Sequence, residues 1–72
     1  MLEEEEMTYI ERMEKENCKL TVKFNRLTSF LGGHKFRELN KCQQQLLVLQ
    51  HNAMNTYKNV LEMRIENEKG LM

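Results

Sequence analysis

The sequence contains no proline and no aspartate, and it has only three glycines in 72 residues. Without proline, no residue interrupts a helix by removing a backbone donor. Charged residues make up 31% of the chain and hydrophobic residues 40%, a balance typical of long helices that pack against one another. A chain this short forms one domain at most and rarely reaches more than about 3–5 kcal/mol of stability by itself. Disulfides, a metal ion or oligomerisation are the usual additional sources of stability.

Cysteine and histidine are also scarce. The two cysteines, Cys18 and Cys42, follow no signal peptide, because the N-terminal MLEEEE is acidic, so we expect no structural disulfide. His34 and His51 lie far apart, and neither has a second ligand at metal-binding spacing, so we expect no metal and no cofactor. No apolar run approaches the roughly 20 residues of a membrane span. Oligomerisation remains, and the sequence predicts a self-associating cytoplasmic protein with no membrane contact.

Groups suited to catalysis are missing as well. The chain has no aspartate, and no cysteine and histidine stand in a nucleophile arrangement. The glycine-containing segment LGGH lacks both the length and the following lysine of a phosphate-binding P-loop. We therefore expect a protein that is not an enzyme.

The 11 basic and 11 acidic residues cancel, but they are unevenly distributed. Residues 1–16 carry a net charge of −5, residues 17–42 carry +5, and the remainder is balanced. A neutral chain is poorly suited to duplex nucleic acid, for which phosphate neutralisation dominates affinity. A small anionic ligand near the basic middle suits it better. The charge pattern alone favours a simpler interpretation, in which the acidic residues stabilise a helix N-terminus and the others are solvated.

The first helix is predicted over residues 8–31. Thr8 and Glu11 form a capping-box pattern, and a heptad seam of apolar residues follows. Asn17 is the only polar residue of that seam, and we interpret it as a residue that fixes register. Gly32 is expected to end the helix in a left-handed conformation. The seam consists of positions 10, 13, 17, 20, 24, 27 and 31.

The second helix is predicted over residues 41–68, after a connector at 32–40. Its start signal is a second capping box, Asn40 with Gln43. Phe36 and Leu39 in the connector are expected to plug the end of the core. This helix carries two apolar stripes, at positions 47, 50, 54, 57 and 61 and at positions 46, 49, 53, 56, 60 and 63.

Together these stripes form a wider apolar arc than one partner helix covers. One stripe is expected to pack on the first helix and the other on neighbouring chains. The sequence thus predicts an all-α, two-helix antiparallel hairpin, a single domain over residues 1–72, that assembles into a symmetric homo-oligomer. An alternative is a protein–protein interaction module or inhibitor, in which the second stripe grips another protein.

Aromatic and basic side chains line the first helix beside its seam. Tyr9, Lys23 and Phe30 share one line with Glu16, and Arg12 and Arg26 stand nearby. A ring that stacks on a base and a cation that holds a phosphate are the minimum parts of a nucleotide site. From the residues alone, the favoured interpretation is structural: the rings widen the packing face and Lys23 extends over it. Tyr57 and Arg64 in the second helix have the same two interpretations.

The pattern YIERMEKEN, continued by spaced leucines and phenylalanines and by LL.LQ..AM..Y...L..RI, resembles a family of small phage proteins related to an uncharacterised crAssphage protein. The resemblance covers Tyr9 to Ile65. The segment LQHNAMNTYKNVLEMRI is also similar in layout to the helical hairpin of phage anti-CBASS cyclic-nucleotide sponges. This resemblance implies a phage-encoded protein of the host cytoplasm. It further implies a homo-oligomer, as a hexamer, that sequesters a cyclic oligonucleotide immune signal between protomers without cleaving it.

The resemblance also implies binding residues. The sponges use an early tyrosine, which Tyr9 matches, and a basic residue followed two positions later by threonine. Arg26 with Thr28 fits that pair, and Lys19 with Thr21 fits it too. Tyr9 is expected to stack on a base and the cations to meet phosphates, with Arg64 reaching in from another protomer. The implied set is Tyr9, Arg12, Lys23, Arg26, Thr28 and Arg64, with His34, Lys35 and Arg37 as loop contacts if the pocket lies at the turn.

Overall fold

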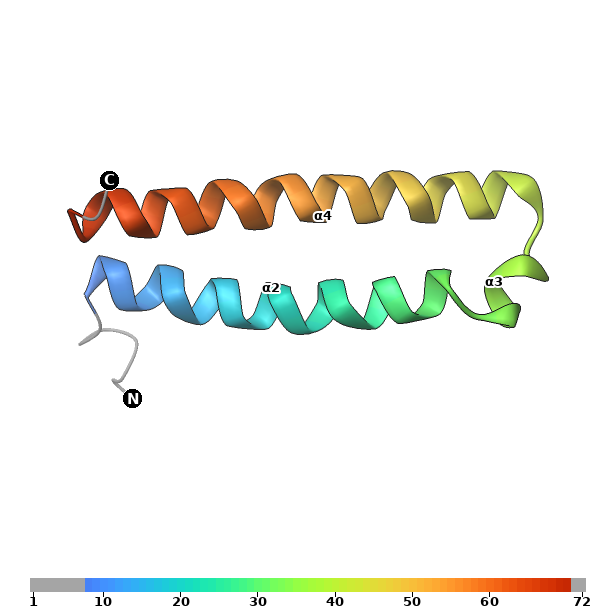
Figure 1. Cartoon of the computed structure of the whole chain (residues 1–72), viewed down its shortest axis with the longest axis horizontal. Coiled ribbons are helices and arrows are strands. Elements are labelled where there is room, and N and C mark those ends of the chain that lie inside the picture. Colours follow the sequence, from blue (N-terminus) through green and yellow to red (C-terminus); the bar gives the residue numbers. More distant parts are fainter. Residues whose placement is uncertain (1–7, 71–72) are drawn as a thin grey trace.

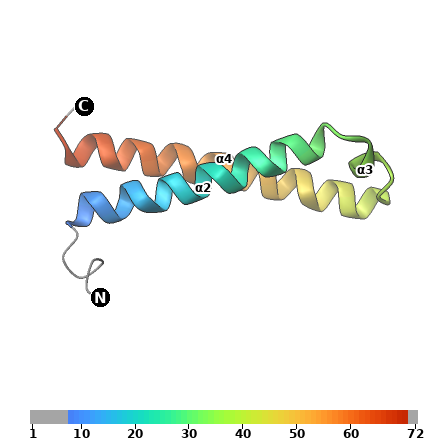
Figure 2. The ribbon, with the colours of Figure 1, turned by 90° about the horizontal axis from the view of Figure 1, so that it is seen from below.

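The computed structural model describes residues 8–70, and over that range the only regular secondary structure is helical. Helix α2 spans Tyr9–Leu31, the short helix α3 spans His34–Arg37, and helix α4 spans Lys41–Glu68. Figure 1 shows α2 and α4 side by side and antiparallel, with α3 closing one end of the hairpin. Turned by 90°, the two long helices cross near their middles (Figure 2). The acidic residues 3–6 lie outside the described residues.

Both long helices begin with the predicted capping box. The Glu11 amide donates to Thr8 Oγ1 at 3.1 Å, and the Thr8 amide donates to Glu11 Oε1 at 2.9 Å. At the start of α4, the Gln43 amide donates to Asn40 Oδ1 at 2.8 Å and the Asn40 amide to Gln43 Oε1 at 3.2 Å. Each box satisfies two backbone donors that have no partner within the helix, which is why sequence reasoning locates both starts.

The predicted left-handed conformation of Gly32 is wrong. Gly32 has φ −87° and ψ −1°, in the right-handed region, and its amide donates to Ser29 O at 3.2 Å. Gly33 is extended, with φ −97° and ψ 168°, because it is the N-cap of α3 and an N-cap lies in the β region. The chain passes directly from one helix to the next, so no reversal of handedness is needed. Within the described residues, only Gly70 has a positive φ, at 74°.

The turn is held together by Gln44, a residue that the sequence did not single out. Its side-chain amide lies 3.1 Å from Phe36 O, 3.4 Å from Arg37 O and 3.0 Å from Leu39 O. These carbonyls belong to the end of α3 and the following link, and of the three Phe36 O also accepts the Leu39 amide at 3.1 Å. Phe36 packs edge-on against Phe30, with ring centroids 6.3 Å apart, and Leu39 is half-buried. Both connector side chains therefore cover the end of the hairpin, as predicted.

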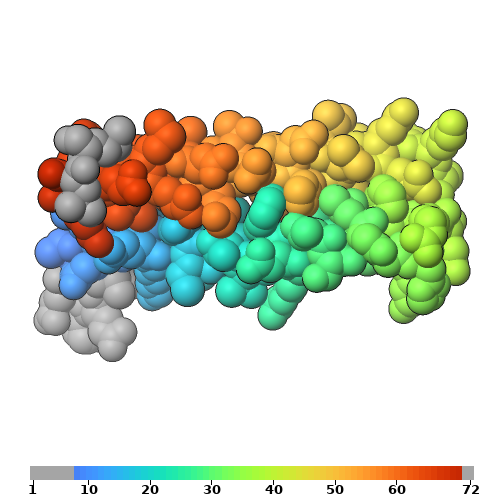
Figure 3. Space-filling model, in the orientation of Figure 1, coloured from blue at the N-terminus to red at the C-terminus, as the bar shows by residue number. Residues whose placement is uncertain are grey.

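The seam of α2 faces α4 along its whole length. Every predicted seam position from Ile10 to Leu31 is buried or half-buried. The core is small, however: among residues 8–70 only Met13, Leu61 and Ile65 are buried, and Leu61 alone is fully enclosed. In the space-filling view the side chains of the two helices meet along the hairpin (Figure 3). The packing is densest near the open end and looser towards the turn.

The seam of α4 is only partly the predicted one. Leu47, Met54 and Leu61 face α2 as expected, but the positions between them are His51 and Lys58 rather than the neighbouring 50 and 57. His51 stacks on Phe24 of α2, with centroids 4.5 Å apart and an interplanar angle of 22°. Lys58 is 21% exposed and pairs with Glu62 at 2.8 Å. The inward-facing positions are 44, 47, 51, 54, 58, 61, 62 and 65.

The other predicted stripe remains outside the hairpin. Leu46 is 60% exposed, Leu49 62% and Met63 53%. At 100° per residue, this outer stripe lies roughly 160° around α4 from the seam, rather than roughly 110° as the two sequence stripes indicated. None of the helices within residues 8–70 is long and apolar enough to cross a lipid bilayer.

Candidate anion-binding groove

A groove of about 390 Å³ runs between α2 and α4 in the half of the hairpin that contains the start of α2 and the end of α4. Six of its lining residues come from α2, and one comes from α4. We call this feature the basic groove. Its lining residues are Arg12, Lys15, Glu16, Lys19, Leu20, Lys23 and Tyr57.

The cations of the basic groove lie on one face of α2. Arg12, Lys15, Lys19 and Lys23 follow one another at steps of three or four residues, which are neighbours on a helix surface. Glu16 is the only acidic residue among the lining residues. Four positive charges against one negative charge make the groove attractive to anions in a chain whose net charge is zero.

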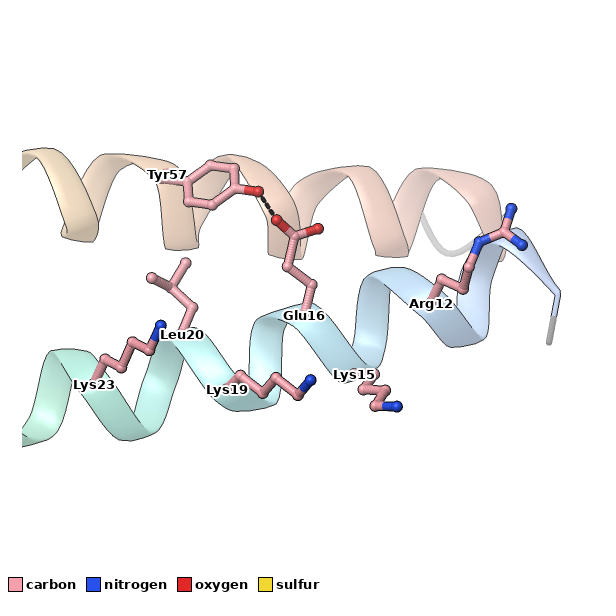
Figure 4. A pocket seen from close by; sticks show the side chains of 7 residues that line it. All are labelled: Arg12, Lys15, Glu16, Lys19, Leu20, Lys23 and Tyr57. Atoms are coloured by element: carbon pink, nitrogen blue, oxygen red, sulfur yellow. Dashed lines mark hydrogen bonds between the residues drawn. The ribbon is translucent and has the colours of Figure 1, made fainter. Parts of the chain in front are cut away.

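Tyr57 forms the opposite wall of the groove. Its hydroxyl donates to the Glu16 carboxylate across the two helices (Figure 4). Leu20 lies between the helices beside the tyrosine ring, half-buried, and provides an apolar floor. The ring itself is 44% exposed, so one aromatic surface is available beside a row of cations. The hydrogen bond to Glu16 holds the ring in place and occupies the one carboxylate of the groove.

Lys19 and Lys23 are exposed and make no ion pair within residues 8–70. Figure 4 shows their side chains extended along α2, with the Lys23 ammonium beside Leu20. An ammonium on a flexible four-carbon stem offers three donors and adapts to the position of a phosphate. These two lysines are therefore the side chains that can move onto a ligand without breaking an ion pair of the hairpin.

Tyr9 and Arg64 meet just beyond the end of the groove. The Arg64 Nη2 donates to the Tyr9 hydroxyl, and the guanidinium carbon lies 5.8 Å from the centre of the Tyr9 ring. Arg12 is one turn along α2 from Tyr9. Both arginines and Tyr9 thus gather at the open end of the hairpin. Arg64 reaches Tyr9 of its own chain, whereas the resemblance to the sponges implied that it reaches into the site of another protomer.

The structure places Arg26 and Thr28 elsewhere. Arg26 is exposed one turn beyond Lys23, and roughly 25 Å separates it from Tyr9 along the helix axis. The Thr28 hydroxyl donates to Phe24 O at 2.9 Å, which leaves its oxygen to accept a bond from His51 Nε2 at 2.8 Å. Thr28 therefore fastens the hairpin. One small ligand on one chain cannot contact Tyr9 and this pair together.

The three predicted loop contacts lie still farther from the basic groove. His34, Lys35 and Arg37 are exposed on α3, at the closed end of the hairpin (Figure 1). They add positive charge at that end, but the structure does not bring them to the groove within one chain. Of the predicted residues, Arg12 and Lys23 line the groove, and Tyr9 and Arg64 adjoin it.

Sequence reasoning missed Lys15 as a member of the site, named Lys19 only as an alternative to Arg26, and left the role of Tyr57 open. The signal for the lysines was present, because steps of three and four residues from Arg12 lead through both of them to Lys23. A search at seven-residue spacing passes over them. From the sequence alone, Tyr57 could equally be a residue of the packing seam of α4, and only the structure shows that it lies outside that seam.

The fold and the groove together define a small helical-hairpin protein with an anion-attracting surface. The chain belongs to the Sequestin family, whose model matches residues 7–67. It is 35% identical over 63 residues to the "Uncharacterized 7.5 kDa protein in denB-rIIB intergenic region" of Enterobacteria phage T4, an alignment that covers 88% of this chain and 98% of that protein. No solved structure matches significantly. The expected membership of a small phage protein family is thereby confirmed, though without a specific link to crAssphage.

Proposed function

We propose that this protein is a phage counter-defence sponge that binds a small nucleotide immune signal in the basic groove and withholds it without cleavage. The observation that carries the proposal is the row of four cations beside an accessible tyrosine ring in an otherwise neutral chain. The name of the family, Sequestin, is consistent with sequestration. The resemblance to cyclic-nucleotide sponges narrows the proposed ligand to a cyclic oligonucleotide or a related cyclic nucleotide.

The phosphates of such a ligand would meet Lys19 and Lys23, with Arg12 and Lys15 adding to the field. Hydrogen bonds from charged donors to phosphate oxygens are roughly twice as strong as neutral ones. A cyclic signal carries more than one phosphate, so a row of cations fits it better than a single site does. Because these lysines are solvent-exposed, the attraction should weaken as salt rises.

A base would stack on an aromatic ring at the groove. Tyr57 offers its ring above the apolar floor formed by Leu20, and Tyr9 offers a second ring one turn beyond Arg12. Stacking of a base on an aromatic side chain contributes about 1–3 kcal/mol and tolerates different bases. Two rings, one beyond the Arg12 end of the row of cations and one opposite its middle, suit a ligand with two bases.

The proposal is binding without turnover. The lining of the basic groove includes no histidine, cysteine, serine or threonine, and its one carboxylate, Glu16, accepts the Tyr57 hydroxyl. General acid–base and nucleophilic catalysis most often use such a group within hydrogen-bond reach of the ligand. The groove is rich in groups that hold an anion and poor in those that most often hydrolyse a phosphodiester.

A ligand panel tests the proposal directly. The purified protein is melted with cyclic dinucleotides, cyclic trinucleotides and cyclic ADP-ribose isomers, after light scattering has established its size. A ligand at about 100 times its dissociation constant adds about 2.7 kcal/mol. At roughly 2.1 cal/mol/K of unfolding entropy per residue, that gain raises Tm by well over 10 °C in a chain of this length. The recovered ligand should be chemically unchanged. A folded protein whose Tm no nucleotide moves would refute the proposal.

Matched lysine variants locate the site. Lys19→Gln and Lys23→Gln should each weaken binding at least several-fold, whereas Lys41→Gln, at an exposed position on α4 outside the groove, should bind as the parent does. Tyr57→Ala and Tyr9→Ala distinguish the two candidate rings. Normal binding by both lysine variants would place the ligand elsewhere, for example at Arg26 or the α3 cations.

A further inference from the structure

The outer stripe of α4 is an unpartnered heptad seam. Its apolar members stay about half exposed, with Leu49 at 62% and Val60 at 45%, and neither α2 nor α3 covers them. The steps between its positions alternate between three and four, as in a helix that packs on another helix. The outer stripe consists of Leu46, Leu49, Ala53, Thr56, Val60 and Met63.

The surroundings of the outer stripe are unusual for a solvated helix. Between Lys41 and Lys58 the sequence contains no aspartate, glutamate, lysine or arginine. An exposed helix face normally carries charged side chains opposite its apolar face. Here four turns of the helix carry none on any face, which is the composition of a helix that is contacted on both sides.

The hairpin also lacks enough core to stand alone. Only three side chains among residues 8–70 are buried, so the interior of one chain is small for two helices of 23 and 28 residues. Chains of this length usually obtain the remaining stability from disulfides, metals or association. The described residues contain no cluster of metal ligands, and Cys18 and Cys42 are both free and exposed. Association is the source that the outer stripe provides.

The order of side chains along the outer stripe identifies the partner. Ala53 and Thr56 are small and sit at its centre, and larger residues lie at equal spacing on either side. We propose that two copies of this chain pair through their outer stripes in antiparallel fashion, about a two-fold axis between Ala53 and Thr56. Leu49 then faces Val60 of the partner subunit, and Leu46 faces Met63 of the partner subunit. Such a surface is self-complementary, as a two-fold interface requires.

Charge at the ends of α4 favours the antiparallel arrangement over the parallel one. The first residue of α4 is Lys41, and its last turns carry Glu66 and Glu68. The cations at that end, Arg64 and Lys69, already contact Tyr9 and Glu14 of α2. Antiparallel copies bring these opposite charges to the same end, whereas parallel copies place like charges side by side. Opposed helix dipoles favour the same arrangement. The pairing leaves the basic grooves accessible, because the outer stripe lies on the side of α4 that faces away from α2. Self-association is therefore expected in the absence of any ligand.

The test is a charge-pair rescue measured by analytical ultracentrifugation, with far-ultraviolet circular dichroism to follow helix content. The parent is expected as a dimer or an assembly of dimers. Leu49→Lys and Val60→Glu each bury an unpaired charge and should weaken self-association at least about 100-fold. The double variant L49K/V60E should regain most of the self-association. In an antiparallel pair, the lysine at position 49 of each copy faces the glutamate at position 60 of the other copy. Parallel pairing would set lysine against lysine and give no rescue.

Val22→Glu is the matched control, since Val22 is an apolar residue of α2 with 46% exposure outside the outer stripe. It should self-associate as the parent does. A monomeric parent overturns the proposal, including a monomer that captures a different protein through this face. So does a double variant that stays dissociated, or a control that weakens association as much as L49K. Rescue also shows that the single variants failed because they buried an unpaired charge and not because they misfolded.

Discussion

The glycines of the turn lead to a prediction opposite to the one that the sequence alone suggests. In the segment LGGH, Gly32 occupies the position of a glycine that ends a helix in the left-handed conformation. Substitution of such a glycine is expected to be destabilising. The structure gives it right-handed angles, φ −87° and ψ −1°. A Cβ built on Gly32 would lie 3.8 Å from Ser29 O, an ordinary contact. Alanine therefore fits without strain, and Gly32→Ala should stabilise the hairpin by restricting the unfolded chain.

The size of the effect follows from known substitutions. Glycine to alanine at a compatible position stabilises by about 0.4–1 kcal/mol. With an unfolding entropy of roughly 0.15 kcal/mol/K for a chain of this length, Tm should rise by about 3–7 °C. Gly70 is the contrasting control, because its φ of 74° is left-handed and its amide donates to Asn67 O at 3.1 Å in the cap of α4. Gly70→Ala should lose about 1 kcal/mol.

Thermal unfolding followed by circular dichroism measures both variants at the same protein concentration. Both variants replace one glycine by alanine. The general effect of that exchange on helix propensity is therefore the same in both, and it cancels when the two Tm shifts are compared. The reasoning requires shifts of opposite sign. A Gly32→Ala variant that is destabilised by as much as Gly70→Ala would mean that the turn needs a left-handed residue, and the described connection between α2 and α3 would be incorrect.

Two further predictions concern the polar layer of the seam. Asn17 has a buried Oδ1 without a hydrogen-bond partner in the described part of the chain, so Asn17→Leu should raise the free energy of unfolding by about 1–3 kcal/mol in urea titrations; an unchanged or lower value would contradict the unpaired acceptor. The hydrogen bond and charge of Lys58 lower the pKa of Glu62 below its ordinary value of 4.5, and Asn17 adds a weaker hydrogen bond in that direction. Because the folded pKa is the lower one, the resulting stability is present above the ordinary value and is lost as pH falls through the folded pKa. Lys58→Met should therefore flatten the acid limb of Tm against pH, and an unchanged limb would contradict this coupling.

The starts of both helices and the seam of α2 were predictable because their signals are local. A capping box needs only two residues three positions apart, and Thr8 and Asn40 each begin one. The apolar heptad positions of α2, with a single polar residue among them, define only one face of the helix that can pack against a partner. The handedness of Gly32 was not predictable in this way, since it depends on whether the next segment is a helix, and the four residues of α3 are too few to produce a recognisable pattern.

The seam of α4 and most of the groove required the structure. Leu47, Met54 and Leu61 fit two seams equally well, and the choice rests on the positions between them. Tyr57 is the more apolar candidate by composition, yet Lys58 takes the inner position because its stem packs while its ammonium reaches Glu62. That rotation moves Tyr57 to the edge of α4, where it becomes a wall of the basic groove. The spacing of residues in the sequence does not predict a site that depends on such a rotation of the helix.

The two ends of this hairpin are fastened by different forces. Hydrogen bonds from Gln44 hold the turn, whereas Met13, Leu61 and Ile65 hold the open end by burial. The basic groove lies in the half that contains these three side chains. Amide hydrogens there should exchange with solvent more slowly than those in the more loosely packed half towards the turn. The groove is thus built beside the best-buried side chains of residues 8–70, and slow exchange there would mean that little conformational entropy is lost when a ligand enters it.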